Sequence, residues 1–280
     1  MKADTGMTND ASNPILTAFE EWHWWPEDAE IVSTSRYLLS VSPEGSPRAT
    51  VHQSLPVFAS DPHALIAEVL AHVRRKGVRS VVWWVAPWTL PDDMGEILTV
   101  HGGRIVEEVE LLEWNLGQGP APHLPAVRAG VAVQVERVRG DVALAVAQQL
   151  AAEVFGDPPP SPAQLTRWTE EIERDESAGN GRHLQFLARV EGEAAGTAAV
   201  SVSGAFARMW GAATLPPYRG TGVYSTLVLA RLVAAHRYGA RHALVKARTG
   251  TSGPILQRTG FTRHGVERAY ELPLEPGGGE

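Results

Sequence analysis

Residues 216–225, PPYRGTGVYS, decide the fold of this chain because they join an apolar run to an amphipathic helix through a glycine loop. Gly220 and Gly222 lack the Cβ atoms that would keep a ligand away from the backbone. Glycine also tolerates the positive φ angles that aim successive N–H groups inward. The helix that follows adds the positive end of its dipole. The stretch therefore predicts a cradle for phosphate groups.

The segments on both sides of the loop predict the order strand, loop, helix. Residues 206–215 are an apolar, strand-like run that ends at two prolines. After the loop, apolar side chains recur at helical spacing until Gly239 ends the helix. The apolar face consists of Tyr224, Leu227, Val228, Leu232 and Ala235. We expect Arg231 and Arg237 to lie off that face.

Three kinds of phosphate-binding loop share this outline, and their spacings differ. A Walker loop has a lysine after its last glycine, and no lysine follows here. A dinucleotide loop has the spacing G-x-G-x-x-G, which residues 220–225 match except at the last position. The next predicted strand, residues 242–247, ends near Lys246 and Arg248 rather than in a ribose-binding acid. An NADP-binding oxidoreductase with Arg248 near the 2′-phosphate is the minor alternative.

The pattern R-x-x-G-x-[GA] fits the loop best. Arg219 to Tyr224 match it, except that Tyr224 replaces the small last residue. Further along, residues 253–261, GPILQRTGF, predict a short helix that ends in a glycine-phenylalanine turn. Together the two motifs resemble the GCN5-related N-acetyltransferase (GNAT) family over residues 131 to 272. The resemblance implies an α/β fold with a mixed sheet.

The resemblance also implies a reaction, the transfer of an acetyl group from acetyl-CoA to a primary amine. A backbone N–H near Thr214 or Leu215 would hold the thioester oxygen, and the loop would bind pyrophosphate. The hydroxyls of Thr221 and Ser225 would add donors, while Arg219 would add charge or order the loop. The implied cofactor-binding residues are Thr214, Leu215, Arg219, Gly220, Thr221, Gly222, Val223, Tyr224 and Ser225.

The catalytic residues stay unassigned because the chain departs from the family at two places. Members often carry a glutamate on the strand before the loop or its neighbour, and residues 194–266 contain no acid. Many also carry a tyrosine four residues before the GF glycine, where Leu256 stands. A non-catalytic, regulatory acyl-CoA-binding module is therefore the second hypothesis. The candidate bases are Glu153, Asp157, His236, His242 and His264, and Ser252 or water is the candidate proton donor.

Charge supports a polyanionic ligand independently of the motifs. The chain has a net charge of −7, yet residues 194–266 carry only cations, and acids concentrate in residues 170–176. This asymmetry favours an anionic partner for the cationic segment. Nucleic acid is not expected, because no nucleic-acid motif is present and the chain is acidic. The cations are Arg208, Arg219, Arg231, Arg237, Arg241, Lys246, Arg248, Arg258 and Arg263.

The domain organisation follows from a break rich in glycine and proline at residues 117–130. After it, residues 131–273 predict the GNAT-like domain: a strand, two helices, a hairpin, then the strand, loop and helix above. Residues 14–116 predict the same plan in reduced form, shorter by about one strand and the phosphate loop. We therefore expect two tandem GNAT-like domains, the first degenerate and without a cofactor site. Residues 1–13 and 274–280 predict flexible ends.

Composition excludes several classes of protein. The 280 residues include no cysteine, which excludes disulfides, a thiol nucleophile and cysteine-ligated metal. We expect a cytoplasmic protein without a membrane span, because the longest apolar runs are too short to cross a bilayer. We also expect no metal ion. Seven of the nine tryptophans lie in the first half. They predict core anchors, with an aromatic acceptor pocket as the alternative. The identity of the amine and the oligomeric state stay open.

Overall fold

The computed structural model describes residues 13–274 except 24, 26–28, 43–47, 54–60, 77, 119–123, 125, 180 and 182. The chain forms two compact units, Met1–Leu111 with His264–Glu280, and Leu112–Arg263. The predicted flexible ends lie outside the described residues apart from Asn13 and Leu274. Both of these have defined contacts: Asn13 caps the first helix, and the buried Leu274 donates its N–H to Arg79 O at 2.8 Å.

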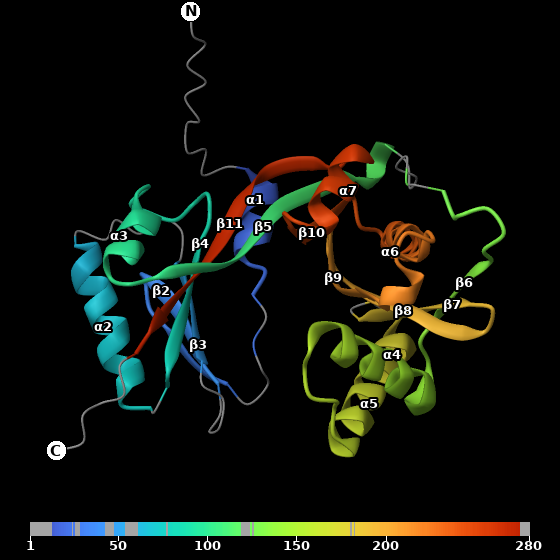
Figure 1. Cartoon of the computed structure of the whole chain (residues 1–280), viewed down its shortest axis with the longest axis horizontal. Helices are drawn as coiled ribbons and strands as arrows, with labels where there is room; N and C mark the ends of the chain where they lie inside the picture. Colours follow the sequence, from blue (N-terminus) through green and yellow to red (C-terminus); the bar gives the residue numbers. More distant parts are fainter. Residues whose placement is uncertain are drawn as a thin grey trace, which may run out of the picture. The chain divides into compact units, whose positions relative to one another are not determined.

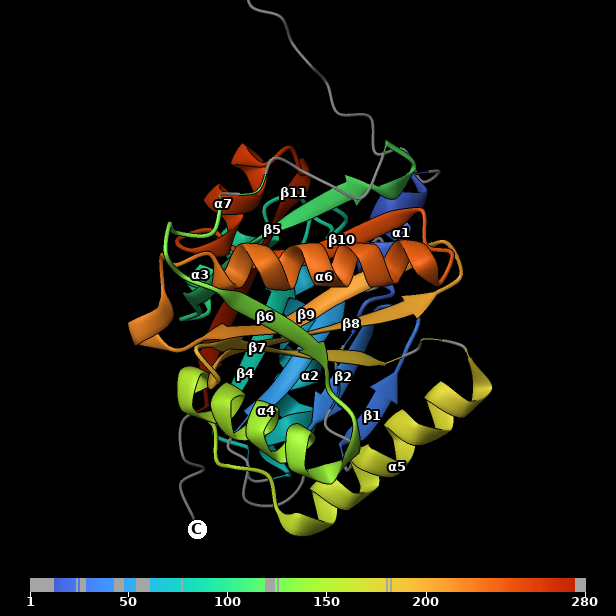
Figure 2. The same ribbon diagram turned by 90° about the vertical axis from the view of Figure 1, so that its right-hand side faces the viewer.

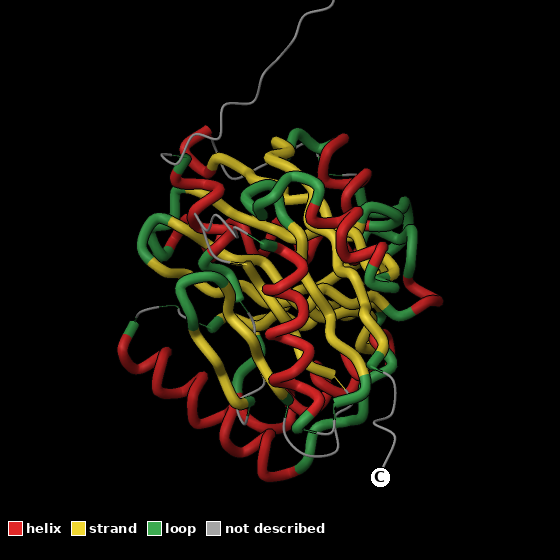
Figure 3. The backbone as a smooth tube through the Cα atoms, turned by 90° about the vertical axis from the view of Figure 1, so that its left-hand side faces the viewer, coloured by secondary structure: helices red, strands yellow, loops and turns green. Residues whose placement is uncertain are grey.

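The first unit is a sheet with helices packed on it. Its strands follow the order β1, β2, β3, β4, β11, β5, and α2 lies across them (Figure 3). The last residues of β5 and the first two of β11 belong to the second unit. The elements are α1 (Pro14–Glu20), β1 (Glu30–Ser33), β2 (Tyr37–Val41), β3 (Arg48–Gln53), α2 (Pro62–Arg74), β4 (Ser80–Val85), α3 (Met94–Val100), β5 (Arg104–Asn115) and β11 (Thr262–Pro273).

The strands of the first unit are mostly antiparallel, and one of them, β11, comes from the predicted second domain. Strands β1, β2 and β3 are antiparallel neighbours, β3 and β4 are parallel, and β11 runs antiparallel to β4. Helix α2 makes the crossover between the parallel strands, as parallel pairing requires. The core contains the fully buried Trp83, as the tryptophan pattern predicts, whereas Trp84 is half-buried. Helices α1 and α3 and strand β1 are not among the elements predicted from the sequence.

The second unit contains the predicted loop. Its strands follow the order β10, β9, β8, β7, β6, with the end of β5 beside β10. The elements are η1 (Leu116–Gln118), β6 (Val133–Arg137), α4 (Gly140–Phe155), α5 (Pro162–Ala178), β7 (Leu184–Val190), β8 (Glu193–Ser203), β9 (Phe206–Thr214), η2 (Pro216–Tyr218), α6 (Val223–Arg237), β10 (His242–Arg248) and α7 (Ser252–Arg258). The predicted order of elements is confirmed here, and the mixed α/β class holds for both units.

Helices cover both faces of this sheet, with α6 on one face and α4 and α5 on the other (Figures 1 and 2). Gly196 on β8 permits the close approach of α6, since a Cβ there would lie 2.8 Å from Val223 Cγ1. The predicted start of α5 is confirmed, because the Ser161 hydroxyl accepts from Gln164 N and Pro162 occupies the first turn. The absence of a side chain at Gly196 lets the α6 N-terminus lie close against the sheet.

The strand directions rule out the dinucleotide-binding alternative. That fold requires a doubly wound parallel sheet. In the second unit, β6 to β9 pair antiparallel with one another, and only β9 with β10 is parallel among the described pairs. The near match of residues 220–225 to the dinucleotide pattern therefore reflects a shared use of glycine at a helix start, not a shared fold.

The packing of α6 supplies a matched test of the fold. Leu227 is fully buried under the sheet, whereas Leu229, two residues later, is 38% exposed. Leu227→Ala should lower the free energy of unfolding by about 2–5 kcal/mol, because it leaves a cavity in the core. Leu229→Ala should change it by about 0.5 kcal/mol or less. Urea unfolding followed by circular dichroism measures both, and equal losses would contradict this packing.

Candidate functional site

The parallel strands β9 and β10 separate near the loop. Their pairing runs from Phe206 with His242 to Met209 with Val245, yet β9 continues to Thr214 and β10 to Arg248. A bulge in the pairing of β8 with β9 falls just beyond Met209, where Gly211 has a φ of 60°. Bulges bend a strand and often lie beside functional sites. The bulge therefore carries β9 away from β10 and opens the sheet between them.

The end of β9 distinguishes between the two predicted oxyanion donors. Leu215 N donates to Ala195 O on β8 at 3.0 Å, so its N–H is already used. Successive N–H groups of a strand point to opposite edges. The N–H of Thr214 therefore points away from β8, toward the side where β9 and β10 separate. Of the two predicted residues, Thr214 is the one whose N–H faces the opening.

The loop after β9 presents a row of unused donors. In the described part of the chain, none of the backbone N–H groups from Gly220 to Ser225 donates a hydrogen bond, and the first helical bond is Thr226 N to Gly222 O at 3.0 Å. No side chain caps α6, because its N-cap residue is Gly222, with a φ of 100°. Such a row at a helix start is suited to bind an anion.

The side chains of the loop mainly stabilise its conformation, and they add few free hydrogen-bond donors to its backbone N–H groups. The hydroxyl of Thr221 donates to Tyr218 O at 2.6 Å, and the side chain of Ser225 is buried. Arg219 is exposed, and its Nε donates to Thr214 O at 3.3 Å. Arg219 therefore ties the loop to the end of β9 and also places a cation beside it. The hydroxyl of Thr221 is engaged within the loop.

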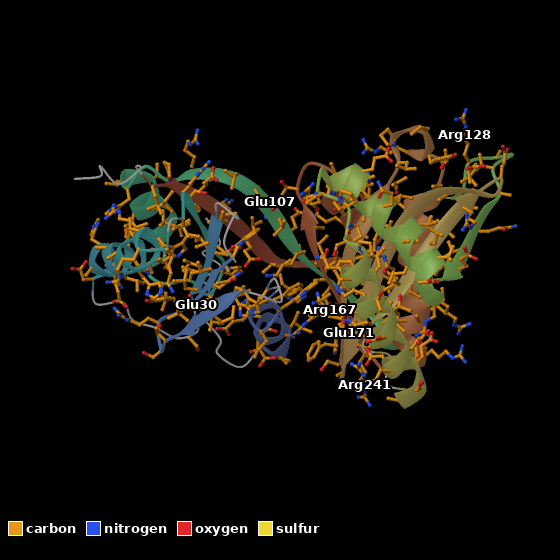
Figure 4. All side chains as sticks on the ribbon, turned by 90° about the horizontal axis from the view of Figure 1, so that it is seen from below. Glu30, Glu107, Arg128, Arg167, Glu171 and Arg241 are labelled. Atoms are coloured by element: carbon orange, nitrogen blue, oxygen red, sulfur yellow. The ribbon has the colours of Figure 1, made fainter. Side chains whose placement is uncertain are left out.

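The segment before β6 packs on the loop. Arg128 N donates to Thr221 O at 3.1 Å, and a Cβ on Gly222 would lie 2.6 Å from the Cα of Val127. Gly222 is therefore required for packing against Val127 as well as for its positive φ. The side chain of Arg128 is exposed and projects away from the ribbon (Figure 4). Residues 127 and 128 of the predicted linker therefore pack against the loop.

A buried polar cluster lies directly behind the loop. Arg231 is only 1% exposed, which corrects the prediction that it lies off the buried face of α6. Burial lowers the pKa of Arg231 to about 10, which the neighbouring Tyr224 partly offsets. Burial also raises the pKa of Tyr224, against the charge of Arg231 and hydrogen bonds to Ser252 and Arg231. The i, i+7 spacing of the two residues is the sequence signal for this contact.

The structure does not gather the candidate bases at the loop. Glu153 and Asp157 are exposed around the end of α4. His236 lies in the last turn of α6, at the opposite end of the helix from the loop. His242 begins β10, opposite the end that separates, and its Nδ1 lies 2.9 Å from Glu113 Oε1. His264 belongs to the first unit.

The described residues bear on two further expectations. No helix in the described ranges combines the length and the apolar character that a membrane crossing requires. Among the same residues, no cluster of three or more His, Asp or Glu side chains is placed to hold a metal ion.

Comparisons with known proteins found similarity in sequence to a protein family and similarity in fold to solved structures. Residues 148–255 match the model of the Acetyltransferase (GNAT) family. No curated protein matches the chain. A GCN5-related N-acetyltransferase from Kribbella flavida has a similar structure, with 18% identity, a TM-score of 0.62, and coverage of 88% of this chain and 90% of that chain. A GCN5-related N-acetyltransferase from Sphaerobacter thermophilus is 17% identical, with a TM-score of 0.62 and coverage of 87% and 82%.

A third solved structure has the two-domain plan in its name. It is a tandem GNAT protein from the clavulanic acid biosynthesis pathway, solved without AcCoA. It is 20% identical to this chain, with a TM-score of 0.58, and the alignment covers 87% of this chain and 79% of that chain. At these identities the likeness concerns the fold, and it extends over both units of the chain.

The loop glycines supply a second matched test. Gly220 and Gly222 both have positive φ, but a Cβ on Gly220 meets nothing within 4 Å. Gly220→Ala should cost about 1–2 kcal/mol, the strain of a left-handed residue. Gly222→Ala should cost more, about 2–5 kcal/mol, because the contact with Val127 adds overpacking. Urea unfolding compares the two variants, and equal costs would contradict the packing of Val127 on the loop.

Proposed function

We propose that this chain transfers an acetyl group from acetyl-CoA to a primary amine, because residues 148–255 match the model of the Acetyltransferase (GNAT) family. The observation that carries the proposal is the row of unused N–H donors from Gly220 to Ser225, beside the opening between β9 and β10. A diphosphate supplies the acceptors and the negative charge that this row lacks.

The residues of the second unit suit the parts of acetyl-CoA. The loop N–H groups and Arg219 would bind the pyrophosphate, and Lys246 and Arg248 add cations at the end of β10. The opening between β9 and β10 would receive the thioester. The N–H of Thr214 faces that opening and would stabilise the charge that develops on the thioester oxygen. The other predicted cofactor residues, Leu215 and Val223, would act by shaping the backbone.

The first unit differs from the second in its parallel strand pair and in the start of its crossover helix. Both differences support its role as a degenerate GNAT-like domain. Its parallel strands stay paired up to His52 and Trp84, close to the ends of β3 and β4. Its crossover helix α2 is capped by Asp61, whose carboxylate accepts from His63 N and Ala64 N. A carboxylate at this position takes the place that a phosphate would need. We therefore propose that only the second unit binds the donor.

The acceptor in this proposal is a small molecule or a peptide with a primary amine. The amine must lose its proton before it attacks, so the site must supply a base or desolvate the amine. A regulatory module that binds acyl-CoA without turnover is the alternative, favoured by the absence of acids in residues 194–266. Release of free thiol from acetyl-CoA with a panel of amines separates the two. The chain contributes no thiol of its own.

A matched pair of loop variants tests acetyl-CoA binding. Gly220→Asp and Gly220→Asn have nearly the same shape, and both residues tolerate the left-handed conformation. They differ by one negative charge beside the unused donors. Gly220→Asp should bind acetyl-CoA at least about tenfold more weakly than Gly220→Asn, about 1.4 kcal/mol. The rise in melting temperature with acetyl-CoA measures the affinity.

The two variants also control for each other. Without acetyl-CoA their melting temperatures should be similar, because the side chain at 220 enters open space. Equal affinities of the two variants would refute phosphate binding at this loop.

A further inference from the structure

The segment before β6 holds an arginine beside the phosphate loop. Arg128 N donates to Thr221 O at 3.1 Å, and Val131 N donates to Arg128 O at 3.0 Å. The side chains of Leu124 and Val131, which precede and follow Arg128 in the sequence, pack against the core of the second unit. The backbone of Arg128 is therefore fixed at the loop by contacts on both sides of it along the chain.

The guanidinium of Arg128 adds a positive charge to this place. The side chain is exposed and projects from the ribbon (Figure 4). Among the residues that the structure describes, no carboxylate forms an ion pair with it. In the sequence, Arg128 is the only Lys, Arg, Asp or Glu from residue 114 to residue 135. A cation held beside a row of unused N–H donors is suited to bind a further anionic group of the same ligand.

The loop has an arginine on each of two sides. Arg219 Nε donates to Thr214 O at 3.3 Å, so Arg219 lies on the side of β9 and of the opening between β9 and β10. Arg128 belongs to the segment that contacts Thr221 and Gly222 from outside the sheet strands. In the proposed donor site, the acyl arm of CoA leaves the pyrophosphate toward the opening. The nucleotide end then extends away from the opening, and Arg128 is the cation on that other side of the loop.

We propose that Arg128 binds the 3′-phosphate at the nucleotide end of acetyl-CoA and makes the chain selective for donors that carry this phosphate. The inference rests on the proposed function. The 3′-phosphate is a monoester with a charge of roughly −1.5 to −2 at pH 7. A guanidinium matches the geometry of phosphate oxygens with two parallel N–H bonds. The segment that the sequence predicts as a linker thereby takes part in donor recognition.

A role in donor selectivity can be separated from a role in holding the loop. The hydrogen bond to Thr221 uses the backbone N–H of Arg128, and the packing on Gly222 uses Val127. A substitution of the Arg128 side chain leaves both contacts in place. Arg128→Gln therefore removes the charge and retains the contacts that hold the loop.

Two donors that differ by one phosphate test the assignment. They are acetyl-CoA and acetyl-dephospho-CoA, which lacks the 3′-phosphate. The wild-type chain should bind acetyl-CoA about tenfold more tightly, the usual contribution of one hydrogen bond to a charged group. Arg128→Gln should bind the two donors within about twofold of each other, because it loses affinity only for acetyl-CoA. Titration calorimetry on the full chain measures the dissociation constants.

Arg237→Gln is the matched control. Arg237 is also exposed, and it lies in the last turn of α6, at the opposite end of the helix from the loop. Its substitution removes the same charge and should keep the wild-type preference. Arg128→Lys keeps the charge without the planar fork and should retain part of the preference. Without a donor, the variants should melt at the wild-type temperature, because each changed side chain is exposed.

The outcomes distinguish this inference from the proposed function. Equal affinity of the wild-type chain for the two donors overturns the role of Arg128 and leaves acetyl transfer in place. The role is also overturned if Arg128→Gln keeps the wild-type preference, or if it loses affinity for both donors by the same factor. If the wild-type chain binds neither donor, the proposed function fails and this inference fails with it.

Discussion

The unsatisfied N–H groups at the start of α6 are the constraint on which the rest of the site depends. Helix starts leave donors that are normally capped by a side chain. Here the N-cap is Gly222, which supplies no side chain and admits Val127 against its backbone. Gly196 lets the same helix end approach β8, and Arg219 ties the loop to Thr214 O. The surrounding contacts hold these N–H groups in place without accepting their hydrogen bonds, so an anion can accept them.

The first unit has the same plan of strands, but the start of its crossover helix is capped. Each unit has antiparallel strands, then a parallel pair joined by a crossover helix. In the first unit, the carboxylate of Asp61 satisfies the start of that helix, and the parallel strands stay paired. A capped helix and a closed pair provide neither an anion site nor room for a thioester. The two units therefore differ at a helix cap and a strand separation, while the plan of their strands is the same.

The sequence predicted the local features well because they depend on neighbouring residues. The glycine loop, the Ser161 cap and the order of the strands all follow from short-range spacing. The burial of Arg231 was missed, because a charged residue beside an apolar face is usually solvated. The contact of Val127 with Gly222 and the use of the Leu215 N–H by β8 were also missed. Each depends on segments that only the folded sheet brings together, and no spacing rule encodes such contacts.

The boundaries of the compact units also explain why the two halves are not separable at the Gly/Pro-rich break. The end of β5 belongs to the second unit, where Leu112 and Leu116 join the core and Trp114 lies against Phe261, with ring centroids 5.7 Å apart. Most of β11 belongs to the first unit and pairs with β4. A cut at residue 116 would therefore remove core side chains from the second unit, and a cut before β11 would remove one of the two strands that pair with β4. Each unit therefore includes part of a strand from the other half of the sequence, and neither half carries a complete unit by itself.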